Sequence, residues 1–179
     1  MTAYRRFCAR FGVPMTVAAA LAAGPAAAQE TEHWGTARGW DVRVDSTLGN
    51  GCFILAGFED GTVFRLGFDR TDDSAYLMVG NDDWGSIGEG KDYELEIRMD
   101  RASPWSAPAT GVRIDGSPFL YIPLDEADFV EEFMRKHTLA IDHDGDEVVR
   151  LSLEGSSAAI VEMVECQDKV DRGVDPFKN

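Results

Sequence analysis

Short apolar segments separated by Gly- and Asp-rich turns run through most of this sequence, and they limit the folds open to the chain more than any other feature. Residues 39–45 and 93–99 alternate apolar and polar side chains with a period of two, which is typical of a β-strand with one face in water. Turns such as Glu59-Asp60-Gly61 predict hairpins and therefore an antiparallel meander. Further strands are predicted over 52–56, 62–68 and 75–79.

The second half of the chain changes from strand-like to helical periodicity. Residues 102–108 are rich in Pro, Ser and Ala and predict a loop, whereas 111–116 and 119–122 predict two strands. A hairpin over 138–153 turns at Asp144-Gly145, and Gly155-Ser156-Ser157 predicts the start of a final helix. An earlier helix is predicted from Asp125 by an apolar stripe at helical spacing: Ala127, Val130, Phe133, Met134 and His137.

The first 28 residues have the composition of a secretory signal peptide. Arg5, Arg6 and Arg10 form a positive region, an apolar run follows at 17–23, and three small residues predict cleavage between Ala28 and Gln29. The apolar run is shorter than the ~20 residues that span a bilayer, so we expect no stable membrane insertion after cleavage. These features predict a periplasmic protein of a bacterial envelope.

Together the elements predict an α+β fold: an antiparallel β-sheet or sandwich of about 7–9 strands, with two helices packed on it near the C-terminus. We divide the chain into a signal peptide (1–28), a flexible N-terminus (29–38), a single globular domain (39–170) and a polar tail (171–179).

Three cysteines become two when the signal peptide is removed, and these are Cys52 and Cys166. Export delivers them to an oxidising compartment, in which two such thiols normally pair. Free or zinc-binding thiols are the alternative, but the close Cys-x-x-Cys spacing and partner histidines of a zinc site are missing. We therefore predict a disulfide between Cys52 and Cys166.

The chain is strongly acidic, with 32 Asp and Glu against 17 Lys and Arg and a formal net charge of −15. Removal of the signal peptide takes away three arginines and no acidic residue, which changes the charge to −18. A field of this sign repels phosphate backbones and anionic lipid surfaces, so it argues against nucleic acid and peripheral membrane binding. A cationic protein partner, a divalent cation or simple solubility in a salty compartment stay open.

No residue pattern predicts a catalytic, cofactor-binding or metal-binding site. A Ser-His-Asp hydrolase would need one of the three histidines (His33, His137 and His143) beside a nucleophilic serine, and the sequence has no Gly-x-Ser-x-Gly motif to supply it. The acidic run 142–147 has its glycine too early for a calcium loop and is explained by a tight Asp-Gly turn. Paired carboxylates for glycoside cleavage stay open, because the sequence does not show which acidic residues converge in space.

Two of the four tryptophans, Trp84 and Trp105, lie in predicted loops beside acidic or proline-rich segments. Such residues can form a recognition surface for a basic partner or a sugar. They can equally cover a core that a small sheet does not close alone, because aromatic side chains bury large areas. The sequence leaves both interpretations open.

Two short segments resemble small exported bacterial proteins of the invasion-associated locus B type. One is the early tryptophan strand Gly39-Trp40-Asp41-Val42, and the other is the strand-Gly-helix ending over 149–160. The sparse cysteines, and Cys166 after the last helix, depart from the pattern of that family. The resemblance implies an envelope protein without known catalysis.

We therefore expect a non-enzymatic periplasmic protein that acts by binding a partner. A sharper form is an inhibitor or immunity-like protein against a basic secreted enzyme, for which an acidic surface is suited. A carboxylate-based hydrolase and a carrier of a small ligand or cation are the alternatives.

Overall fold

The computed structural model describes residues 31–125 and 127–173. Within these ranges the fold is one antiparallel sheet with two helices near the C-terminus, which confirms the predicted α+β class. The signal peptide, its cleavage site between Ala28 and Gln29, and most of the polar tail lie outside the described residues. The strands are β1 (Thr31–Ala37), β2 (Trp40–Asp45), β3 (Gly51–Gly57), β4 (Val63–Asp69), β5 (Ser74–Gly80), β6 (Asp92–Met99), β7 (Trp105–Ile114), β8 (Ser117–Leu124), β9 (Thr138–His143) and β10 (Asp146–Ser152).

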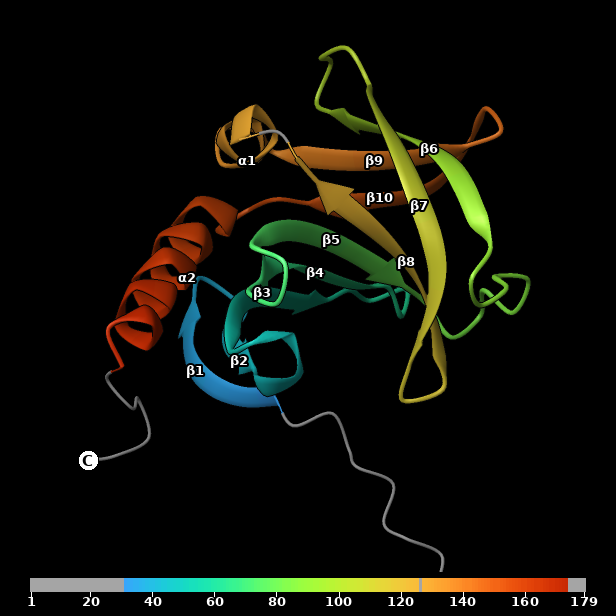
Figure 1. The fold of residues 1–179 in the computed structure, drawn as a ribbon. Coiled ribbons are helices and arrows are strands. Elements are labelled where there is room, and N and C mark those ends of the chain that lie inside the picture. The colour runs from blue at the N-terminus through green and yellow to red at the C-terminus, as the bar shows by residue number, and fades with distance from the viewer. Residues whose placement is uncertain (1–30, 126, 174–179) are drawn as a thin grey trace, which may run out of the picture.

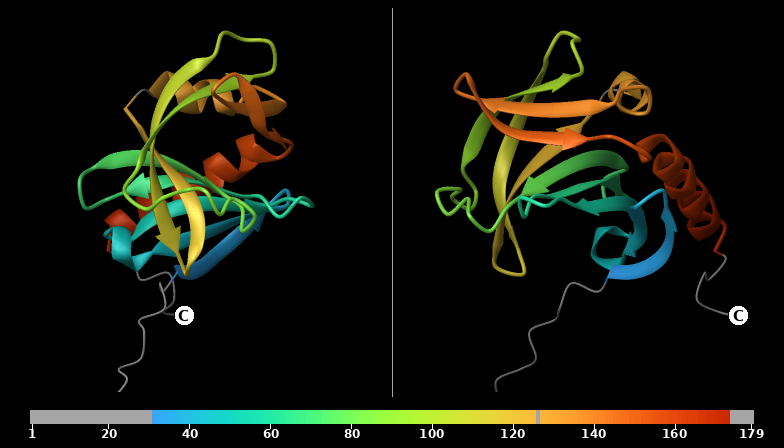
Figure 2. Two further views of the ribbon diagram at one scale, coloured as in Figure 1. Left: turned by 90° about the vertical axis from the view of Figure 1, so that its right-hand side faces the viewer. Right: turned by 180° about the vertical axis from the view of Figure 1, so that it is seen from behind.

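The strand order is β1-β2-β3-β4-β5-β8-β7-β6-β9-β10, and every pair of neighbours is antiparallel. Strands β2 to β5 follow one another as the predicted meander requires, whereas β6, predicted to continue it, is separated from β5 by β8 and β7. Helix α1 (Ala127–Phe133) connects β8 to β9, and α2 (Ser156–Asp171) follows β10 and packs beside β1, β2 and β3 (Figure 1). The sheet curls strongly, so that the half containing β6, β7, β9 and β10 lies across from the half containing β2 to β5 (Figure 2).

The main core fills the inside of this curl. Trp40, Phe64 and Phe133 meet there, with the Phe64 and Phe133 rings stacked at 5.6 Å and Trp40 edge-on to both. Leu139, Ile141, Val149 and Leu151 cover the core from β9 and β10, because alternate residues of a strand point to the same face. A smaller cluster around Tyr76, Met78 and Phe119 lies on the opposite face of the sheet.

Two boundaries differ from the predictions, and the first of them adds the tenth strand to the expected 7–9. The N-terminal segment 29–38, predicted to be flexible, contains strand β1. Its main chain pairs with β2, and Trp34 Nε1 donates a hydrogen bond to Glu162 Oε1 of α2 at 3.1 Å. The polar composition of this segment hid the strand, because an edge strand is held by backbone bonds and needs no apolar alternation.

The segment 102–108, predicted as a loop, contributes its last four residues to β7. Residues 105–109 of β7 pair with β6 alone, and pairing with β8 begins only at Thr110. Pro108 therefore lies on a stretch with one free side, where its missing N–H costs no ladder bond. In the other direction, the helical stripe predicted to reach His137 ends earlier, because α1 stops at Phe133.

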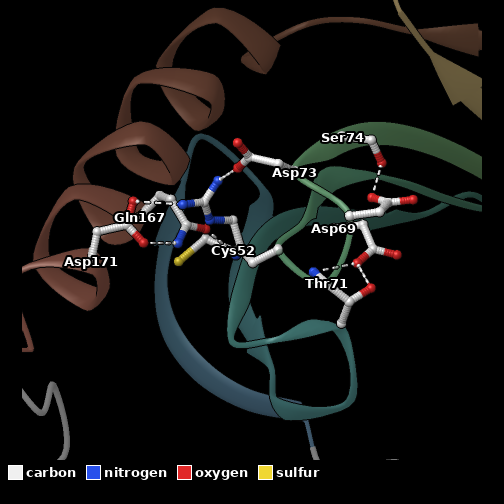
Figure 3. A network of polar contacts seen from close by, with 9 residues as sticks. Cys52, Asp69, Thr71, Asp73, Ser74, Gln167 and Asp171 are labelled. Carbon is white, nitrogen blue, oxygen red and sulfur yellow. Dashed lines mark hydrogen bonds and ion pairs between the residues drawn. The ribbon is translucent and has the colours of Figure 1, made fainter.

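The predicted disulfide is present and joins Cys52 of β3 to Cys166 of α2. Hydrogen bonds reinforce the same contact: Cys52 N donates to Gln167 Oε1 at 2.8 Å, and Gln167 Nε2 donates to Asp171 Oδ1 at 2.9 Å. Arg70, from the β4–β5 turn, also approaches Asp171. Figure 3 shows Gln167 and Asp171 of α2 beside Cys52. The last helix is thus fastened to the first half of the sheet by covalent and polar contacts.

Candidate functional site

A pocket of about 240 Å³ opens at one end of the curled sheet, and we take it as the candidate site. We call it the mouth pocket. Leu95, Leu120 and Ile87 form its apolar floor and are almost fully buried. The exposed residues Asp83, Ser86 and Val148 lie at its rim, and Trp84, Tyr93 and His143 supply aromatic walls.

The floor and walls come from three strands that converge at this end and from the loop between β5 and β6. Tyr93 and Leu95 share the inner face of β6 because they are two residues apart, and Leu120 and His143 join them from β8 and β9. Such an end of a curled sheet is a common place for ligand pockets, because the side chains of the last layer have no further layer to pack against.

Val148 reaches the rim through an irregularity in β10. The pairing register between β9 and β10 shifts between Glu147 and Val149, so Val148 has no partner in the ladder. Its side chain is 42% exposed, which is unusual for a valine in a strand beside the core. A β-bulge of this kind re-aims a side chain and is often found next to functional sites.

The loop between β5 and β6 carries Trp84 and Ile87 and is held in place by its own hydrogen bonds. Trp84 N donates to Asn81 O at 3.0 Å, and Ile87 N donates to Trp84 O at 3.1 Å. Gly88 N donates to Tyr93 Oη at 2.9 Å, which ties the loop to β6. The aromatic wall is thus built before any ligand arrives.

His143 is oriented by two neighbours. Its Nδ1 lies 3.0 Å from the Glu94 carbonyl oxygen, which can only accept, so Nδ1 carries the proton and donates. Its ring meets Tyr93 edge-on at 5.8 Å, and Nε2 is 3.6 Å from the exposed Asp144 carboxylate. Asp83 thus lies at the rim of the pocket, and the carboxylate of Asp144 lies beside the pocket through its contact with His143.

The two tryptophans named as a recognition surface do not lie together. Trp84 lines the mouth pocket. Trp105 lines a separate hollow with Phe129 of α1, its ring edge-on to Phe129 at 5.7 Å, and its Nε1 donates to Glu132 Oε2 at 2.8 Å. Trp105 therefore covers the core beneath α1, and Trp84 alone contributes to the candidate site.

The sequence reasoning missed Tyr93, His143 and Val148 as site residues. Tyr93 lies in the predicted strand 93–99, and His143 lies beside the predicted hairpin turn at Asp144-Gly145. A signal for Val148 was present, because two consecutive valines at 148 and 149 break the period-two pattern of the strand and indicate a bulge. The convergence of the three residues depends on pairing between β6, β9 and β10, which local sequence does not specify.

Away from the mouth pocket, Asp45, Arg65 and Tyr76 form a polar cluster that is buried. Asp45 Oδ2 and Arg65 Nη2 are 2.6 Å apart, and Arg65 Nε donates to the Tyr76 hydroxyl at 2.5 Å. Burial works to raise the pKa of Asp45, but hydrogen bonds from Thr47 and the adjacent Arg65 outweigh it and lower the pKa. Burial raises the pKa of Tyr76, which keeps its hydroxyl neutral. Because these groups are buried, we assign them to stability.

Within residues 31–125 and 127–173, no three His, Cys, Asp or Glu side chains gather so as to hold a metal ion. In the same part of the chain, neither helix has the length and apolar character needed to cross a membrane.

No family model matches this sequence, and no curated protein matches it. The crystal structure of invasion associated protein B from Bartonella henselae does match the fold, with a TM-score of 0.55 and 12% sequence identity. The likeness covers 78% of this chain and 99% of that chain. At 12% sequence identity this likeness supports a shared fold and nothing about function. The chain is thus similar in fold to invasion associated protein B, as its early tryptophan strand and its strand-Gly-helix ending indicated.

Proposed function

We propose that this protein is a non-enzymatic periplasmic binding protein, and that its mouth pocket takes one apolar side chain of a basic partner protein. The observation that carries the proposal is the pairing of an apolar floor with an acidic rim in one small, preformed pocket. Leu95, Leu120 and Ile87 offer contacts for an apolar group, and Asp83 and Asp144 lie where cationic neighbours of that group can reach them.

The size of the pocket supports a side chain rather than a whole small ligand as its occupant. Pockets for drug-sized ligands measure about 300–1,000 Å³. The mouth pocket, at about 240 Å³, is smaller. Exposed Val148 and half-buried Trp84 would lose their remaining contact with water on binding, which is the behaviour of anchor positions at protein interfaces.

Charge supports a basic partner. The chain carries a net charge of −15, and acidic side chains flank the pocket. Complementary charge accelerates encounter and selects against acidic competitors, while the apolar anchor supplies most of the lasting affinity. Binding of this kind weakens as salt rises, because the rim charges are exposed and screened. Inhibition of a basic secreted enzyme is the sharpest form of this proposal.

The first test uses short amidated peptides and NMR of the purified mature protein. We expect Lys-Phe-Lys to shift the Trp84 indole and His143 signals, and Lys-Gly-Lys and Glu-Phe-Glu to shift them much less. Equal shifts with Glu-Phe-Glu would contradict the basic partner, and equal shifts with Lys-Gly-Lys would contradict the apolar anchor.

The second test compares two exposed valines, Val148 at the pocket and Val161 on α2, which are 42% and 51% exposed. We expect Val148→Asp to abolish the Lys-Phe-Lys shifts and Val161→Asp to leave them unchanged. The same pair is then used to capture partners from the envelope fraction at low and high salt. A basic protein bound at low salt by wild type and Val161→Asp, but lost with Val148→Asp, supports the proposal. A partner bound equally by Val148→Asp refutes the pocket as its site.

A further inference from the structure

Another hollow, about 690 Å³ in volume and open to solvent, lies at the opposite end of β9 from the mouth pocket. It is bounded by the β6–β7 turn, the segment before β9, and β10. Three of its six lining residues are cations, although the chain has almost twice as many acidic as basic residues. The lining residues are Asp100, Arg101, Ala102, Lys136, Thr138 and Arg150.

Two of the three cations are held in place by neighbouring carboxylates. Lys136 Nζ is 3.1 Å from Glu132 Oε1, and Arg150 makes a two-pronged contact with Glu147 through Nε and Nη2. These contacts use one of the three donors of the ammonium and two of the five donors of the guanidinium. Both side chains are therefore fixed and still have donors for a further acceptor.

Arg101 differs from them. Among the described residues, no carboxylate lies within 4 Å of its side-chain nitrogens. The adjacent Asp100 does not pair with Arg101. Its Oδ1 instead accepts hydrogen bonds from His137 N, Thr138 N and Thr138 Oγ1. Arg101 thus keeps its whole guanidinium fork, a shape that matches the oxygens of a phosphate or carboxylate group.

The net negative charge of the protein does not prevent an anion from binding here. At physiological ionic strength the Debye length is about 8 Å, so distant surface carboxylates are largely screened. The nearby carboxylates of Glu132 and Glu147 are already neutralised by Lys136 and Arg150. The hollow itself is lined by three cations, Arg101, Lys136 and Arg150, and by one carboxylate, Asp100, so positive charge is in excess there.

We propose that this hollow binds a phosphate group, with Arg101 as the principal ligand and with Lys136 and Arg150 as flanking donors. The group can belong to a soluble phosphate or to the head group of an anionic lipid, because the same oxygens are presented in both. The proposal is independent of the mouth pocket, which lies at the other end of the strand.

The test is an NMR titration of the mature protein with inorganic phosphate, against sodium chloride of equal ionic strength. We expect phosphate alone to shift the backbone amides of Arg101, Ala102 and Thr138. Arg101→Ala should weaken binding at least about five-fold, and Arg101→Lys should lie between that variant and wild type. Arg172→Ala is the matched control, because this arginine is exposed at the end of α2 and should leave binding unchanged. All variants should keep the wild-type melting temperature.

Sedimentation with phosphatidylcholine vesicles, with and without phosphatidic acid, distinguishes the two sources. Vesicle binding that requires Arg101 assigns the site to a lipid head group, and phosphate binding without vesicle binding assigns it to a soluble phosphate. The proposal is overturned if neither probe binds above the chloride control, or if Arg101→Ala and Arg172→Ala behave alike.

Discussion

Replacement of Asp45 by Asn tests the ion pair between Asp45 and Arg65, in which both charged side chains are buried. The Asp45 carboxylate is fully buried and uses both oxygens: Oδ1 accepts from Thr47 N at 2.8 Å and from its hydroxyl, and Oδ2 binds Arg65. An amide offers one acceptor and no charge, so Arg65 loses its counter-ion. Arg65 is itself only 5% exposed. Leaving a buried charge unpaired costs about 3–5 kcal/mol, and we expect Asp45→Asn to lower the free energy of unfolding by that amount.

The double variant Asp45→Asn/Arg65→Met separates charge from shape. Methionine retains an unbranched stem over the Phe53 ring, on which the Arg65 guanidinium now lies at 3.7 Å from the centroid. Because neither charge remains, we expect the double variant to recover more than half of the loss. Glu131→Gln is the control: its exposed pair with Arg135 should contribute less than about 1 kcal/mol.

Urea unfolding at pH 7, followed by tryptophan fluorescence and circular dichroism, measures these differences. A loss below about 1 kcal/mol for Asp45→Asn, or a double variant no more stable than the single one, would refute the reasoning.

The pH dependence of the free energy of unfolding provides an independent check. The pKa of Asp45 is lower in the folded protein than its ordinary value of 3.8, so its contribution is complete above that value and disappears as the pH falls through the folded-state pKa. The stability gap between wild type and Asp45→Asn should therefore be constant near neutral pH and shrink below about pH 4.

Two further predictions concern the disulfide and the smaller core. Cys52→Ala/Cys166→Ala removes a link between residues 114 apart in sequence, and by the loop-entropy estimate it should cost about 5 kcal/mol, seen as a lower urea midpoint against the oxidised wild type. An unchanged midpoint would show that the polar contacts of α2 suffice. Gly80→Ala places a Cβ about 2.5 Å from the Phe119 ring and should cost about 1–3 kcal/mol, whereas Gly57→Ala, with nothing within 4 Å, should be close to neutral in the same assay; equal effects would contradict this packing argument.

Local sequence predicted most of the elements correctly because their signals act over a few residues. Alternation over 39–45 and 93–99, the turn at Asp144-Gly145 and the helix start at Ser156 depend on side-chain periodicity and backbone preference, and all four appear where they were expected. The disulfide was predicted because only two cysteines remain after the predicted signal peptide and export would expose them to an oxidising compartment. The strand at 31–37 was not predicted, because an edge strand can be polar on both faces and then lacks the alternating pattern.

Only the tertiary structure decided the sites. The sequence by itself determined an acidic α+β domain with Cys52 and Cys166 paired, since these depend on composition, periodicity and count. The mouth pocket requires β6 to pair with β9, and the bulge at Val148 requires a specific register between β10 and β9. The buried Asp45–Arg65 pair likewise joins side chains 20 residues apart. Such convergence arises from long-range strand pairing, whose free energy is shared over the whole sheet and leaves no local mark in the chain.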